Sequence, residues 1–257
     1  MTRLVRRTIA GLVAALLGFA FVPAVAQDRT PPPLEDVIDR LDHLYRADTS
    51  VGRMELEVIT PRRRRTLRMN FWARGLDRTL VVIEAPARER GTATLRVERN
   101  LWNYLPRISR TIRVPPSMML GSWMGSDFTN DDLVQAASYA DDFAGSFVGR
   151  SDAPAGWVYR FDAREGVVGR WKRVDYVMSE SGELPLLARY YDRRLRLART
   201  MRFDQVRELG GRRLPSRLTL ERTDEEGSRT VLRYIDLDFD TDVPESTFSL
   251  SRLERGR

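Results

Sequence analysis

The sequence predicts a mainly β protein of the α+β class with two amphipathic helices, and three observations lead to this prediction. From residue 53 onward, apolar and polar residues alternate over many short segments, as in strands with one apolar and one solvent-facing side. Turn-forming pairs that contain glycine separate several of these segments, at a spacing of roughly ten residues that fits one continuous antiparallel sheet. Two stretches, 34–45 and 129–137, instead have the spacing of helical faces.

The first helix is predicted directly after the prolines at 31–33. Its apolar residues repeat at steps that place them on one helical face, and they are Leu34, Val37, Ile38, Leu41, Leu44 and Tyr45. The acidic residues at 35 and 36 favour the N-terminal end of a helix. A face of this kind must pack against something apolar.

Alternating apolar residues mark the predicted strands on both sides of a proline pair at 115–116. The strands lie at 54–58, 67–71, 80–83, 95–98 and 102–104, and then at 157–161, 174–178, 188–190, 201–203, 218–220 and 235–239. Together they predict an antiparallel meander that is apolar on one face and solvated on the other. The second helix is predicted to begin at 129–132, with Asp127 as a candidate cap.

The N-terminal residues have the composition of a secretory signal peptide. Three arginines lie among the first seven residues, an apolar run follows over 9–22, and Ala24-Val25-Ala26 is a small-x-small cleavage site. The run is shorter than the roughly 20 apolar residues of a membrane span, so we expect cleavage after Ala26. The pair Arg6-Arg7 also suggests a twin-arginine export signal. The residues after the pair fit that signal poorly and favour the general secretory route. We therefore predict a periplasmic protein with one domain, 27–257.

The charged residues and the absence of cysteine exclude several classes of protein. The chain holds 43 basic and 36 acidic residues and no cysteine, which excludes disulfides and a cysteine-linked lipid anchor. An excess of arginine is typical of nucleic-acid binding, but export and the interspersed acidic residues argue against such a partner. The densest basic run, 62–65, has two interpretations: a solvated hairpin tip, or a contact for anionic lipid headgroups or an acidic partner.

Few residues are suited to catalysis or metal binding. The single histidine, His43, lies off the apolar face of the first predicted helix, and without cysteine the usual zinc sets cannot be assembled. The sequence has no G-x-S-x-G elbow and no phosphate-binding glycine loop. The aspartates in 236–242 lack the glycine and glutamate spacing of a calcium loop. The sequence leaves open a pair of carboxylates that could hydrolyse glycosides, but it marks out no such pair. We predict that the protein is not an enzyme and binds no metal or cofactor.

Residues 115–128 are unusual for a loop. They include three methionines, a tryptophan and a phenylalanine between glycines and serines. Loops normally run over the surface, so these apolar side chains must either fill a core or meet a ligand. Methionine suits surfaces that accept varied apolar shapes. A lid and a plug over an open barrel mouth are equally good interpretations.

These residues and their neighbours resemble the family of outer membrane lipoprotein-sorting proteins, relatives of the lipoprotein carrier LolA. The resemblance rests on Trp102-x-Tyr104-x-Pro106, on Arg110-x-x-Arg113-x-Pro115-Pro116-Ser117-Met118-Met119, on Ser122-Trp123-Met124-Gly125-Ser126-Asp127-Phe128-Thr129-Asn130-Asp131-Asp132-Leu133, and on Val243-Pro244-Glu245-Ser246-Thr247-Phe248. It implies an incomplete antiparallel β-barrel, with helices covering its concave face and a hydrophobic cavity between them. The lipoprotein carrier itself is shorter and lacks the loop at 122–128, so the resemblance implies a carrier without naming its cargo.

The resemblance implies a periplasmic carrier that binds the acyl chains of lipoproteins or lipids for transfer towards the outer membrane. Its expected partners are those chains, an inner-membrane transporter of the resistance-nodulation-division class, and the membrane surface in transient contact. The candidate lid residues are Met118, Met119, Trp123, Met124 and Phe128, and the candidate wall residues are Met69, Phe71, Trp102 and Tyr104. Each of them also fits an ordinary core. The alternatives are a non-carrier binding or assembly module of such an exporter system, and a hydrolase with an unrecognised site.

Overall fold

The fold is built on one antiparallel sheet of thirteen strands, counted over the residues that the structure describes. This computed structural model describes residues 30–135, 139–167 and 169–255, so the predicted signal peptide at 1–26 lies outside the described residues. The described residues from Pro31 onward form one compact unit. Within the described ranges, no helix has both the length and the apolar character that a membrane span requires.

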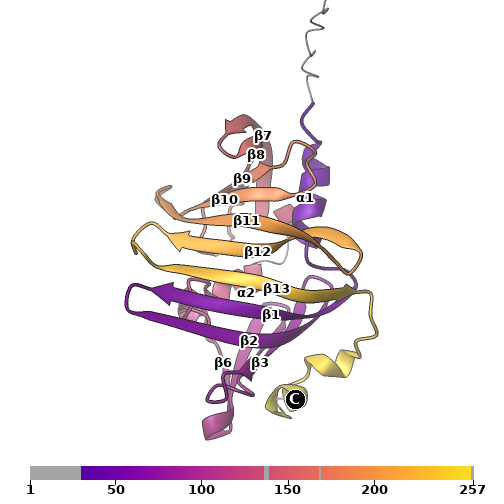
Figure 1. The fold of residues 1–257 in the computed structure, drawn as a ribbon, viewed down its shortest axis with the longest axis vertical. Coiled ribbons are helices and arrows are strands. Elements are labelled where there is room, and N and C mark those ends of the chain that lie inside the picture. The colour runs from indigo at the N-terminus through magenta and orange to yellow at the C-terminus, as the bar shows by residue number, and fades with distance from the viewer. Residues whose placement is uncertain (1–29, 136–138, 168, 256–257) are drawn as a thin grey trace, which may run out of the picture. The chain divides into compact units, whose positions relative to one another are not determined.

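The strands lie in the order β6-β5-β4-β3-β2-β1-β13-β12-β11-β10-β9-β8-β7. Figure 1 shows the part of this order from β2 through β1 and β13 to β7, from bottom to top. Their bounds are β1 Thr49–Thr60, β2 Arg63–Arg74, β3 Arg78–Ala85, β4 Ala93–Val97, β5 Asn100–Leu105, β6 Arg110–Arg113, β7 Phe143–Asp152, β8 Ala155–Ala163, β9 Arg173–Met178, β10 Pro185–Tyr191, β11 Leu197–Leu209, β12 Arg212–Arg222 and β13 Arg229–Phe239. Strands β6 and β7 are the two open edges, because the sheet does not close on itself. The predicted incomplete barrel is therefore confirmed.

The first and last strands pair in the middle of the sheet. Their register places Ser50 opposite Phe239 and Ile59 opposite Arg229. All other neighbours in the sheet are consecutive strands. Two meanders, β1–β6 and β7–β13, are thus joined by the β1–β13 pair, and the chain crosses between them through residues 114–142.

The helices lie on both sides of the sheet. Their bounds are α1 Leu34–His43, α2 Asn130–Gln135, α3 Tyr139–Asp142 and α4 Leu250–Arg255, with single turns of 3-10 helix at Pro106–Ile108, Pro116–Met118 and Glu245–Phe248. Helix α1 contacts α3 and β7, and its predicted apolar residues pack into the core. Helix α4, which the sequence analysis did not predict, packs instead on β4 and β6.

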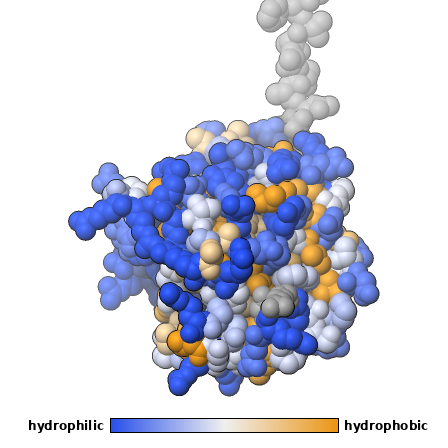
Figure 2. All heavy atoms as spheres, turned by 60° about the horizontal axis from the view of Figure 1, so that its bottom comes forward, coloured by the Kyte–Doolittle hydropathy of each residue, from blue (hydrophilic) through white to orange (hydrophobic). Residues whose placement is uncertain are grey.

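The apolar core occupies both faces of the sheet. Strand β3 shows why, since Val81 and Ile83 belong to one cluster while Leu80 and Val82 belong to another, as the period of two requires. We call the face with Val81 and Ile83 the inner face and the opposite one the outer face. The outer cluster includes Leu253 of α4. In the view of Figure 2 hydrophilic residues predominate and apolar residues form small groups between them, so most large apolar residues are internal.

Gly52 of β1 marks a bend on the inner face. It lies opposite Phe71 of β2, and the β1–β13 register shifts between Arg53 and Met54. A Cβ at position 52 would lie 2.5 Å from the carbonyl oxygen of Asp236 and 2.8 Å from the Phe71 ring. The ring therefore occupies the space that a side chain at 52 would need. A bulge and a glycine kink are the devices that curve a sheet.

Candidate ligand-binding cavity

A cavity of about 300 Å³ lies on the inner face, between the sheet, α1 and the segment that ends in α2. Its volume is at the lower end of the roughly 300–1,000 Å³ typical of ligand pockets. The apolar part of its lining is Leu41, Leu44, Met54, Phe71, Ala73, Val81, Leu101, Trp123, Phe128, Leu133, Phe143, Trp171, Val174, Met201, Phe203, Leu218 and Leu232. Such a lining suits a hydrocarbon ligand.

The loop at 119–129 is fastened over the inner face by three separate strands. Trp123 Nε1 donates to Thr94 Oγ1 of β4 over 3.1 Å. The Asp127 backbone N–H donates to Thr230 Oγ1 of β13 over 3.0 Å, and that hydroxyl donates to the Asp127 carboxylate over 2.7 Å. Arg65 of β2 donates to the carbonyl oxygen of Met124 over 2.7 Å. A few polar contacts thus fix the cover, while its aromatic rings point into the cavity.

The basic run at 62–65 divides into an exposed hairpin tip and one arginine with a structural role. Its first three arginines are exposed at the β1–β2 hairpin, as a solvated tip requires. Arg65 is different, because it pairs with Glu89 and also holds the loop at Met124. Arg65 is therefore a structural residue of the cavity cover.

Helix α2 begins with a reciprocal cap rather than with the predicted one. The Asp132 backbone N–H donates to Thr129 Oγ1 over 3.1 Å, and the Thr129 backbone N–H donates to Asp132 Oδ2 over 2.7 Å. This arrangement satisfies two of the open donors at a helix start. The prediction that Asp127 caps the helix is wrong, because the Asp127 carboxylate is engaged with Thr230.

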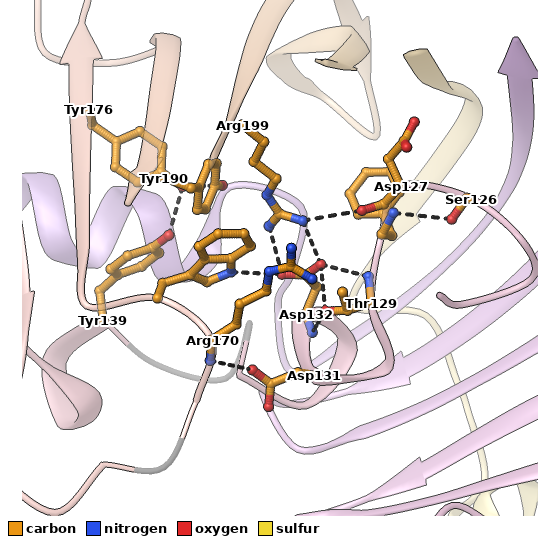
Figure 3. Close-up of polar contacts among 12 residues, drawn as sticks. Ser126, Asp127, Thr129, Asp131, Asp132, Tyr139, Arg170, Tyr176, Tyr190 and Arg199 are labelled. Atoms are coloured by element: carbon orange, nitrogen blue, oxygen red, sulfur yellow. Dashed lines mark hydrogen bonds and ion pairs between the residues drawn. The ribbon is translucent and has the colours of Figure 1, made fainter. Parts of the chain in front are cut away.

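Asp132 also forms a buried ion pair with Arg199 of β11 (Figure 3). The two guanidinium nitrogens of Arg199 donate to the two carboxylate oxygens over 2.7 and 2.6 Å. Its guanidinium carbon lies 4.2 Å from the Trp171 ring centre and 4.3 Å from that of Tyr190, at the distance of cation–π contacts. Burial alone would raise the pKa of Asp132, but the charge and hydrogen bonds of Arg199 hold that pKa below its usual value.

Three tyrosines add hydroxyl groups to the same region (Figure 3). The hydroxyls of Tyr139 and Tyr176 are 2.8 Å apart, and those of Tyr176 and Tyr190 are 3.5 Å apart. Burial raises the pKa of each of them above its ordinary value. The hydroxyls are therefore neutral donors and acceptors at neutral pH.

Asp131 is expected to make stability depend on pH. Burial raises its pKa to about 6, although the backbone N–H of Arg170 donates to it over 3.1 Å. A carboxyl group with a raised pKa favours the folded state most below its unfolded pKa, and this contribution is lost as pH rises through about 6. The free energy of unfolding of the wild type should therefore fall by on the order of 2–3 kcal/mol between acidic and neutral pH because of this group. Asp131→Asn should not show this fall.

Urea unfolding of wild type and Asp131→Asn across this pH range measures that contribution. The difference between the two proteins isolates Asp131 from other titrating groups. A difference that is the same at every pH would contradict the prediction. The exposed Asp141→Asn is the matched control.

The structure brings some of the predicted site residues together and separates others. Phe71, Trp123 and Phe128 line the cavity. Met69 is buried in the same cluster, and Met124 packs partly against it, but neither lines the cavity. Met118 is exposed and Met119 is half-buried. The two remaining wall candidates, Trp102 and Tyr104, lie in the outer cluster.

The period of two explains this placement of Trp102 and Tyr104. On β5 it is Leu101 that lines the cavity, and its neighbours therefore face outward. In the predicted strand at 95–98, Arg96 alternates with Leu95 and Val97, which places it on the face expected to be solvated. That assignment is wrong: Arg96 is 2% exposed and lines the cavity. The sequence carries no signal for this placement, because the packing on both faces of β4 is what buries Arg96.

Comparisons with known proteins agree with this geometry. A protein family described as "Uncharacterized protein" matches residues 75–255. No curated protein matches the sequence. A solved structure of a DUF1329 family protein from Desulfovibrio piger is similar, with 23% identity, a TM-score of 0.77, and coverage of 85% of this chain and 96% of that one.

Two further solved structures have the same fold. A LolA superfamily protein from Nitrosomonas europaea is 22% identical with a TM-score of 0.71, and the match covers 85% of this chain and 98% of that one. An outer membrane lipoprotein-sorting protein domain from Vibrio parahaemolyticus is 19% identical with a TM-score of 0.73, covering 86% and 96%. At these identities the likeness concerns the fold, and it confirms the half-barrel that the sequence predicted.

Proposed function

We propose that this chain, which belongs to the family whose model matches residues 75–255 and shares the fold of the LolA superfamily structures, is a carrier that holds the acyl chain of a lipid or lipoprotein in the inner-face cavity. The observation that carries this proposal is the cavity of about 300 Å³, lined by apolar residues of the sheet, α1 and the cover loop. The signal-peptide pattern of residues 1–26 supports the periplasm as the place of action.

Burial alone supplies enough free energy for such a carrier. Each CH₂ group removed from water contributes about 0.8 kcal/mol, so an acyl chain is bound without covalent chemistry. Release requires the cover to move. The contacts of Trp123, Asp127 and Arg65 with the strands are few and polar, and a receiving protein or membrane that competes for them would open the cavity.

Binding of a neutral fluorescent probe, phenylnaphthylamine, tests whether the cavity accepts an apolar ligand. We expect the wild type to enhance the probe's fluorescence and to release lipid on solvent extraction. Ala73→Phe places a ring in the cavity, since Ala73 lines it. Its affinity for the probe should fall at least about tenfold, which corresponds to only about 1.4 kcal/mol.

The matched control is Ala144→Phe on β7, where the alanine is exposed. This variant should bind the probe as the wild type does. If Ala73→Phe also binds normally, the probe lies elsewhere and the cavity is not the site. If the wild type binds neither probe nor lipid, a non-carrier module of an envelope exporter takes the place of the carrier.

A further inference from the structure

One residue of the cavity lining has no role in the carrier mechanism described so far. Arg96 lies in the middle of β4, and its side chain faces the cavity because Ala93 and Leu95 face the outer cluster. Only 2% of Arg96 is exposed. Its Nε donates to the carbonyl oxygen of Glu98 over 2.9 Å. Its Nη1 is buried and has no hydrogen-bond partner among the described residues.

A buried guanidinium nitrogen without a hydrogen-bond partner needs an explanation. Burial, and after it the charge of Arg46, lowers the pKa of Arg96 to about 10, so the side chain is still a cation at neutral pH. Buried polar groups nearly always have a partner, and an exception commonly marks a missing ion or ligand. A buried charge without a partner is costlier still.

The other charged groups of the lining do not supply that partner. Among the described residues the lining holds three arginines and two aspartates. Arg199 and Asp132 satisfy each other. Asp42 accepts the backbone N–H of Tyr139 over 2.6 Å, and its negative charge acts on Arg46. The lining therefore has one cation in excess.

The surroundings of Arg96 complete a polar corner in an otherwise apolar cavity. Thr79 of β3 is its cross-strand neighbour and also lines the cavity. Arg46 contributes a second positive charge, and its Nη1 donates to the Leu76 carbonyl oxygen over 3.0 Å. Asp77 and Asp142 also act electrostatically on Arg96, but neither lines the cavity.

We propose that the cargo is an amphiphile with an anionic head, a carboxylate or a phosphate, and that Arg96 binds this head while the apolar lining holds the tail. This inference rests on the proposed carrier function and adds the polar end of the ligand. Guanidinium donors match carboxylate and phosphate oxygens in geometry and charge. A neutral lipid would leave Arg96 without a partner.

Displacement of phenylnaphthylamine by ligands with one tail and different heads tests the inference. We expect dodecanoate or dodecyl phosphate to displace the probe from the wild type at concentrations at least about tenfold lower than dodecanol, as a charge-assisted hydrogen bond predicts. Arg96→Met should abolish this preference, so that dodecanoate, dodecyl phosphate and dodecanol displace the probe at similar concentrations. Arg96→Lys should retain part of it. Arg110→Met, at an exposed position of β6, is the matched control and should behave as the wild type does.

Thermal unfolding separates this role from a merely structural one. Removing an unpaired buried charge should not lower the unfolding temperature of Arg96→Met, and dodecanoate should raise that temperature in the wild type only. If the anionic ligands and dodecanol bind equally well to the wild type, the inference fails while the carrier function stands. If inorganic phosphate alone competes as well as dodecyl phosphate, the corner is a site for free anions and the inference also fails. If no amphiphile displaces the probe, the carrier function fails with it.

Discussion

Replacing Arg199 with methionine is expected to lower the free energy of unfolding by about 3–5 kcal/mol, the usual cost of removing one partner from a buried ion pair. Asp132 would keep its charge in a largely buried site, with only the donors of Thr129 and Trp171 left. The cation–π contacts of the guanidinium with Trp171 and Tyr190 would also be lost. Urea unfolding at neutral pH measures the change.

Two further variants show whether the pair is the cause. Arg217→Met removes an arginine whose pair with Asp204 is about one third exposed, and it should cost no more than about 1 kcal/mol. Combining Arg199→Met with Asp132→Leu removes both charges and should recover much of the loss. If Arg199→Met is as stable as Arg217→Met, the buried pair contributes no more to stability than an exposed one.

Gly52→Ala is expected to destabilise the protein by about 3 kcal/mol, the upper part of the usual range for overpacking. The new methyl group would lie 2.5 Å from a backbone oxygen of β13, which cannot move without disturbing the sheet. The Phe71 ring, 2.8 Å from the same position, would be pushed towards the cavity. Chemical unfolding should therefore show lower stability, and the neutral probe should bind more weakly.

The neighbouring Arg53→Ala is the control for the substitution at Gly52. Arg53 pairs with Asp236 on the exposed side of β1, so its loss should change stability by less than about 1 kcal/mol. Probe binding should stay at the wild-type level. Equal stability of Gly52→Ala and the wild type would mean that the sheet does not depend on an empty position at 52.

Most of the sheet was predictable because most strands have one buried face. Strands such as β1 and β8 alternate strongly enough to be recognised. The two edge strands were missed, and the reason is the same for both. In β6 no residue is buried, and in β7 only Phe143 is. A strand exposed on both faces has no hydrophobic period to detect.

The site was less predictable than the fold. The sequence pointed to the aromatic cover, and Trp123 and Phe128 lie at the cavity. It could not tell which face of the outermost strands points inward, so Leu101 lines the cavity where Trp102 was expected. It also could not tell the buried Arg96 from the many solvated arginines, because only the packing of both faces of β4 buries it.

The central pairing of β1 with β13 has a consequence for how the chain acquires its structure. Contacts between Ser50 and Phe239 close one of the longest loops in the domain, and such non-local contacts slow folding. Until the last strand has been synthesised, β1 and β12 each present an unpaired edge, the kind of surface on which strands of different molecules associate. Truncation before β13 would therefore split the sheet into two halves with four open edges, a species prone to aggregate.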